Sequence, residues 1–63
     1  MSINYTKNGK GKYQVKLNGK EYFVERMISG NWCIFTLDRE VREIVRTKGN
    51  ATVWLYKNIL KTL

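Results

Sequence analysis

The sequence contains no histidine and no proline, and its 63 residues include a single cysteine, Cys33. Without histidine, the chain lacks both the usual general base near neutral pH and the commonest metal ligand in proteins. A lone thiol inside an expected strand cannot form an internal disulfide and is typical of a buried, inert cysteine. These absences favour a cytoplasmic protein that is not an enzyme and that uses no metal or cofactor.

Long apolar runs are also missing, since no stretch approaches the ~18 apolar residues that a membrane-spanning helix needs. Residues 1–7 lack the apolar segment and the small-residue cleavage site of a secretory signal. Hydrophobic residues nevertheless make up 43% of the chain, including two Trp, four Tyr and two Phe, which is too many for a disordered protein. We expect one small folded domain with no membrane partner, stable by about 3–5 kcal/mol.

Acidic residues are scarce: five Asp and Glu stand against twelve Lys and Arg, which gives a net charge of +7. A small protein with such an excess attracts polyanions at ordinary ionic strength. Nucleic acid, an anionic membrane surface and an acidic protein all fit this charge, and solubility alone is a further explanation. Charge therefore limits the class of partner without selecting one.

Residues 1–11 are polar and contain two glycines within Asn8-Gly9-Lys10-Gly11. Glycine-rich polar sequence favours irregular backbone. We interpret residues 1–11 as a flexible basic arm with at most a short strand at 3–5, and residues 12–63 as the single domain. Such an arm can follow a phosphate backbone, although many termini have no role. Its charge comes from Lys7 and Lys10, and Lys12 follows it directly.

Residues 12–17 alternate between polar and apolar side chains and are followed by Asn18-Gly19. Asn-Gly after such a run predicts a β-hairpin, because both central residues of a type I′ turn need positive φ. A two-residue loop also fixes the register of the two strands. The expected pairs are Tyr13 with Val24 and Val15 with Tyr22 on one face, and Lys12 with Glu25, Gln14 with Phe23 and Lys16 with Glu21 on the other.

Two further strands are expected at 32–37 and 41–46, separated by turns at 29–31 and 38–40. The third strand has two possible facings: either Cys33, Phe35 and Leu37 point toward the core, or Trp32 and Ile34 do. In the fourth strand, Arg42 and Arg46 share a face. They either grip phosphates or base edges, or protect a solvated edge strand from pairing with other chains.

From Thr47 or Asn50 onward the pattern changes to the period of a helix that ends near Lys61. Its apolar stripe is expected on the core: Thr52, Leu55, Tyr56, Ile59, Leu60 and Leu63. The opposite side holds Trp54, Lys57, Asn58 and Lys61. Trp54 either stacks on an unpaired base beside the lysines, packs at the margin of helix and sheet, or lies in a dimer interface. The predicted class is α+β: an antiparallel meander of three to four strands, most simply four, with one carboxy-terminal helix packed on one face.

Strands followed by Thr47-Lys48-x-x-Ala51-x-x-Trp54-Leu55 resemble the strand-to-helix step of AP2-like and integrase amino-terminal domains. The resemblance covers roughly residues 31–60. It implies a sheet backed by one helix that binds DNA, with the sheet in the major groove and basic and polar side chains on the face away from the helix.

The leading hypothesis is a small, basic, non-enzymatic protein that binds nucleic acid, most simply DNA, through phosphate contacts. The alternative is a protein-interaction module of phage or accessory type that binds and modulates a larger acidic host protein through Phe23, Met27 and Trp54. We expect a monomer or a weak homodimer. The candidate nucleic-acid-binding residues are Lys12, Gln14, Lys16, Arg42, Arg46, Lys48, Trp54, Lys57 and Lys61.

Overall fold

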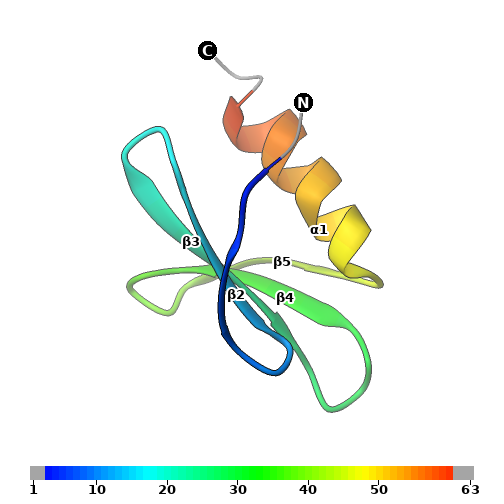
Figure 1. Cartoon of the computed structure of the whole chain (residues 1–63). Coiled ribbons are helices and arrows are strands. Elements are labelled where there is room, and N and C mark those ends of the chain that lie inside the picture. The colour runs from blue at the N-terminus through cyan, green and yellow to red at the C-terminus, as the bar shows by residue number, and fades with distance from the viewer. Residues whose placement is uncertain (1–2, 61–63) are drawn as a thin grey trace.

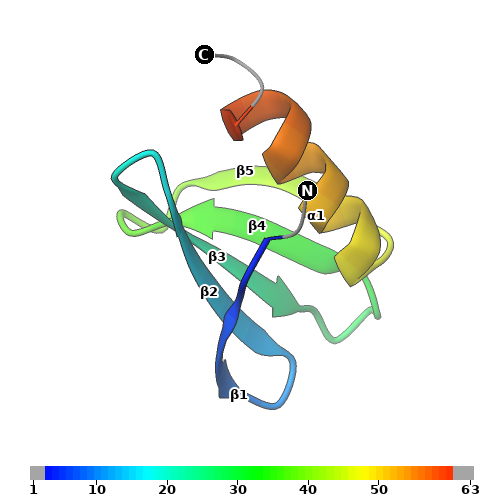
Figure 2. The ribbon, with the colours of Figure 1, turned by 45° about the horizontal axis from the view of Figure 1, so that its top comes forward.

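Five antiparallel strands and one helix make up residues 3–60, the part of the chain that this computed structural model describes. The strands lie in chain order across a single sheet, and the helix α1 packs on one face of it, against β3, β4 and β5 (Figure 1, Figure 2). None of the described helices is long and apolar enough to cross a membrane. The elements are β1 (Thr6–Gly9), β2 (Lys12–Leu17), β3 (Lys20–Arg26), β4 (Trp32–Thr36), β5 (Val41–Val45), α1 (Lys48–Leu55) and a π-helical turn, η1 (Tyr56–Leu60).

The α+β class is confirmed, but the expected count of four strands is wrong by one. The additional strand, β1, pairs antiparallel with β2, with Thr6 opposite Gln14. It lies inside the range that we interpret as an arm, and its sequence of polar residues and glycine has no apolar alternation from which a strand could be predicted. Before it, Ile3 and Tyr5 pack against the core, and the hydroxyls of Tyr5 and Thr52 are 2.8 Å apart.

The β2–β3 hairpin has the predicted register, pair by pair, from Lys12 opposite Glu25 to Leu17 opposite Lys20. Asn18 and Gly19 both have positive φ, of 52° and 82°, as a type I′ turn requires. One face of the hairpin therefore points its apolar residues toward α1, and the other face turns its lysines and glutamates away.

The facing of β4 is that of the second predicted alternative, with Trp32 and Ile34 toward the helix. Ile34 is fully buried and lies opposite Val24. A β-bulge interrupts the pairing with β5, because Ile34 pairs with Glu43 while Phe35 pairs with Val41. Arg42 is the extra residue of this bulge, which local periodicity could not predict.

The core lies between the sheet and α1. Its buried residues are Val15, Tyr22, Val24, Ile34, Ala51 and Leu55. Thr47 is the N-cap of α1, with its Oγ1 accepting a hydrogen bond of 3.0 Å from the Asn50 backbone N–H.

The predicted helix stripe is right in part. Leu55 and Ile59 pack on the core, but Tyr56 is 37% exposed and Ala51 is buried instead. Ala51 and Leu55, four residues apart, face the core, so the buried side of α1 is rotated from the predicted stripe before Tyr56 is reached. From Tyr56 to Leu60 the α-helix gives way to a π-helical turn. Leu63 lies outside the described residues.

Candidate nucleic-acid interface

The sheet face away from α1 carries the three polar β2 residues that we predicted as binding groups. Lys12 and Lys16 are exposed, while Gln14 is half-buried and donates a hydrogen bond of 2.6 Å from Nε2 to Glu21 Oε1. Glu21 and Glu25 lie directly opposite the two lysines on β3. Two positive and two negative charges therefore balance on this half of the face, which weakens its attraction for phosphate.

The centre of the same face is apolar. The rings of Phe23 and Phe35 stack with their centroids 5.2 Å apart and their planes 13° apart. Leu37, which is 67% exposed, and Ile44, 48% exposed, lie toward the two ends of this face. We call Phe23, Phe35, Leu37 and Ile44 the apolar patch.

Cys33 also lies on this face, opposite Ile44, and is half-buried rather than fully buried as expected. Burial, and to a smaller extent the carboxylate of Glu25, raise the pKa of the thiol. A raised pKa disfavours the thiolate, which is the nucleophilic form of cysteine.

Arg42 and Arg46, which we predicted to share a face, have different environments. Arg42 Nη1 is 3.2 Å from Glu40 Oε1, which is the only ion pair among residues 3–60. Arg46 follows the end of β5 and is exposed. Part of the charge of Arg42, on β5, is thus already opposed by Glu40 in the preceding turn.

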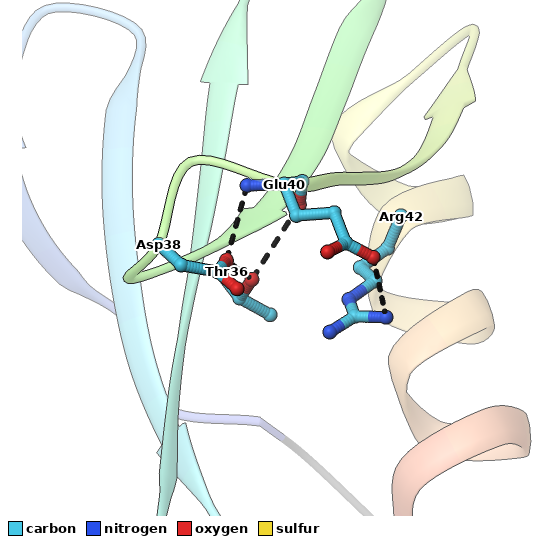
Figure 3. Close-up of polar contacts among 4 residues, drawn as sticks. All are labelled: Thr36, Asp38, Glu40 and Arg42. Carbon is cyan, nitrogen blue, oxygen red and sulfur yellow. Dashed lines mark hydrogen bonds and ion pairs between the residues drawn. The ribbon is translucent and has the colours of Figure 1, made fainter.

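That turn, between β4 and β5, is ordered by side-chain hydrogen bonds (Figure 3). Thr36 Oγ1 donates to Asp38 Oδ1, and the same carboxylate accepts from the Glu40 backbone N–H at 3.1 Å. These hydrogen bonds, first that from Thr36, lower the pKa of Asp38. The turn therefore keeps a negative charge close to Arg42.

The predicted residues of the helix have separate environments. Trp54 is half-buried and packs against the core, as in the second of its three predicted settings. Lys57 is exposed, and Lys61 lies outside the described residues. The helix therefore offers no tryptophan free among lysines within its described part.

Lys48, by contrast, lies against aromatic rings. Its Nζ is 3.9 Å from the ring centroid of Tyr13 and 4.8 Å from that of Tyr5. Both distances are within the range of cation–π interactions. Lys48 thus holds its charge over the Tyr13 ring on β2, and no ion pair among residues 3–60 opposes it.

The β1–β2 and β3–β4 turns lie at the same end of the sheet (Figure 1). Residues of both turns, together with Tyr13, whose ring Lys48 covers, line a feature that sequence reasoning missed. It is an open hollow of about 600 Å³. We call it the basic hollow, and its lining residues are Lys7, Lys10, Gly11, Tyr13, Arg26, Met27, Ile28 and Trp32. The Arg26 backbone N–H at the end of β3 donates to the Gly11 carbonyl at 2.8 Å, which extends the β2–β3 pairing to the β1–β2 turn.

Positive charge and aromatic rings meet in the basic hollow. Lys7, Lys10 and Arg26 are exposed, and no Asp or Glu is found among the described residues that line it. The rings of Tyr13 and Trp32 are 6.0 Å apart between centroids and tilted by 39°. A second hollow of about 530 Å³, at the other end of the sheet, differs because Glu21 and Asp38 line it beside its cations.

The alternative partner-binding residues are not brought together. Phe23 belongs to the apolar patch and Met27 lines the basic hollow. Trp54, on α1, packs against the core. Of these, only Phe23 and Met27 lie at surfaces where apolar side chains gather.

Comparison with protein-family models, with curated proteins and with solved structures found no match to this chain. The resemblance to AP2-like domains therefore stays a prediction.

Proposed function

We propose that the protein binds nucleic acid without catalysing a reaction, through phosphate contacts centred on the basic hollow. One observation supports this above the others: three exposed cations, Lys7, Lys10 and Arg26, surround aromatic side chains with no acidic residue among the described lining. Lys48 adds a fourth positive charge against Tyr13.

Phosphate binding depends on cations whose charge is not already opposed. On the sheet face away from α1, Glu21 and Glu25 lie opposite Lys16 and Lys12, and Glu40 pairs with Arg42. The basic hollow has no such opposition among its described residues. We therefore assign the main phosphate contacts to the hollow and a supporting, long-range attraction to the other predicted cations, including Arg46 and Lys57.

The test compares two triple variants that remove the same charge from different places. The hollow variant is Lys7→Gln/Lys10→Gln/Arg26→Gln. The second, which we call the opposite-face variant, is Lys12→Gln/Lys16→Gln/Arg42→Gln and removes cations that lie opposite or pair with glutamates. Each variant lowers the net charge from +7 by three, to +4. Affinity for a short oligonucleotide is measured at ~50 and ~200 mM salt. We expect affinity of the unaltered protein to fall steeply with salt, and the hollow variant to lose at least tenfold in affinity and about one unit of salt slope per lost contact.

The opposite-face variant should lose less, because it removes lysines that already face glutamates. Equal losses in the two variants would show that net charge, and not the hollow, determines binding. Affinity that does not change with salt would contradict phosphate binding altogether.

A second candidate function, the protein-interaction module, is favoured by the apolar patch. Leu37 and Ile44 are strongly exposed beside the stacked Phe23 and Phe35, and lysines and glutamates border them. An apolar centre with a polar rim is the composition of many protein interfaces. Its test is capture of a stoichiometric acidic partner after nuclease treatment, retained by the hollow variant and lost with Leu37→Ser/Ile44→Ser.

A further inference from the structure

We propose that the basic hollow binds unpaired nucleotides, so that the ligand is a single-stranded nucleic acid with a base against Trp32 and its phosphates on Lys7, Lys10 and Arg26. This inference rests on the proposed function and names the class of nucleic acid that the site selects.

The aromatic side chains of the hollow favour an unpaired base over a base pair. In a duplex, each base is covered by its neighbours in the stack and shows only its edges in the grooves, so an aromatic ring finds no base face to stack on. An unpaired base exposes its face and stacks readily on aromatic side chains, whatever its identity. Two half-buried rings beside exposed cations therefore suit a single strand better than a duplex.

Trp32 is the ring that receives the base. The ring of Tyr13 already has Lys48 Nζ 3.9 Å from its centroid, so one side of it is occupied. Trp32 stands next to Tyr13 at a tilt of 39°, and no cation lies over its ring among the cation–π pairs of residues 3–60. Trp54, which we predicted as the stacking group, packs against the core as Trp32 does, but only Trp32 lines the basic hollow.

The β3–β4 turn adds an apolar wall to the same site. Met27 is 38% exposed and Ile28 is fully exposed, although both are apolar, and both line the hollow. Two backbone hydrogen bonds order the turn, from Met27 N to Asn31 O at 2.7 Å and from Gly30 N to Met27 O at 2.9 Å. Uncovered apolar side chains on an ordered turn, next to Trp32, offer a base further apolar surface.

The size of the hollow agrees with this ligand. Its volume of about 600 Å³ falls within the roughly 300–1,000 Å³ of sites that hold small organic molecules. It therefore has room for one nucleotide unit of a flexible strand, and the exposed cations that line it can contact the phosphates on either side.

The experiment uses the two tryptophans, Trp32 and Trp54, as separate reporters. In Trp54→Phe the only tryptophan left is Trp32, and in Trp32→Phe it is Trp54. Each variant, with its fold checked by circular dichroism, is titrated with oligo(dT) of 12 nucleotides and with a 12-base-pair duplex at ~50 mM salt. We expect oligo(dT) to quench Trp32 and to leave Trp54 unchanged.

Affinities are measured in parallel by anisotropy of labelled DNA. The single strand should bind at least tenfold more tightly than the duplex, and Trp32→Ala should weaken single-strand binding by about 5- to 150-fold, the range for loss of one base–aromatic stack. Because Trp32→Ala also removes core packing, Trp32→Leu serves as a second variant that keeps apolar volume and loses only the stacking ring.

The other outcomes separate this inference from the proposed function. Equal affinity for single strand and duplex without quenching of Trp32 would overturn the inference, while salt-sensitive binding lost in the hollow variant would leave the proposed function standing. If inorganic polyphosphate competes as well as oligo(dT), the site recognises charge alone, and this result would also overturn the inference. Binding to phosphatidylserine vesicles but not to oligonucleotides would overturn both, as would absence of all binding at low salt.

Discussion

Lys48 illustrates at the scale of one residue how a cation can serve the fold and a binding surface together. It is the first residue of α1, and its Nζ lies over the rings of Tyr13 on β2 and Tyr5 before β1. The interaction joins three segments of the chain and is worth roughly 0.5–2 kcal/mol, depending on how far water is excluded. It also keeps a positive charge beside the basic hollow without the mobility of a free lysine.

Asp38 gives a prediction at the same scale, about pH. Hydrogen bonds from Thr36 and Glu40 stabilise its carboxylate and lower its pKa below the usual 3.8. A group whose pKa is depressed by folding stabilises the fold above its unfolded pKa and loses that contribution as the pH falls through the folded value. We therefore expect Asp38→Ala to be less stable than the unaltered protein at pH 7, with the difference shrinking below about pH 4 and vanishing under strong acid.

Urea unfolding followed by circular dichroism between pH 2 and pH 7 measures this difference. Asp38→Asn is the matched control, because it keeps an acceptor oxygen and removes the titration. Its stability relative to Asp38→Ala should not change with pH. A difference between the unaltered protein and Asp38→Ala that is as large at pH 2 as at pH 7 would show that the carboxylate does not order the turn.

At the scale of elements, two glycines in different turns give opposite predictions for the same substitution. Gly19 has φ of 82°, and an added Cβ would meet nothing within 4 Å, so Gly19→Ala costs only backbone strain, about 1 kcal/mol of unfolding free energy. Gly49 lies in the first turn of α1, and its Cβ would be 3.7 Å from Thr47 Oγ1, an ordinary contact. Gly49→Ala should stabilise the protein by roughly 0.5–1 kcal/mol.

Equilibrium denaturation of both variants at one pH and salt concentration measures the two effects. The substitutions add the same methyl group, so each serves as the control for the other. Destabilisation by Gly49→Ala would mean that the helix does not begin where its N-cap places it. A neutral Gly19→Ala would mean that the hairpin turn is not held in the type I′ conformation.

Each element could be predicted from the sequence only where its own residues carry a signal for it. The β2–β3 hairpin was predictable because Asn18-Gly19 demands one turn type and the turn fixes every pair of the register. The strand β1 was not, because its residues are polar and only the presence of β2 beside it makes it a strand. The bulge at Arg42 likewise depends on pairing between strands and leaves no local signal.

The candidate site was predictable only in fragments. Lys7 and Lys10 belong to the predicted basic arm, but Arg26 and Trp32 were not expected to lie beside them. The hollow forms because β1 pairs with β2 and because β4 turns Trp32 toward the helix. The first of these features was missed, and the second was one of two open alternatives.

At the scale of the whole molecule, unbalanced charge dominates. The net charge is +7, and residues 3–60 contain one ion pair, Arg42 with Glu40. Repulsion among the remaining cations destabilises the compact state, and salt screens it. We expect the melting temperature to rise between ~20 and ~300 mM NaCl, and to rise less in Lys7→Gln/Lys10→Gln, whose net charge is lowered by two, to +5.

Thermal unfolding by circular dichroism at fixed pH measures both proteins. A melting temperature that falls with salt would mean that attractive charge pairs outweigh repulsion. The expected rise also separates two effects in the binding experiments, because salt that weakens nucleic-acid binding while strengthening the fold cannot act by unfolding the protein.

The order of the strands has a kinetic consequence. Each strand pairs only with its neighbour along the chain, from β1 to β5, so every ladder closes a short loop. Short loops cost little chain entropy to close, and proteins built from such local pairings fold faster than sheets that join distant segments. A molecule that opens can therefore close again quickly, which limits the time during which its strand edges are exposed to other chains.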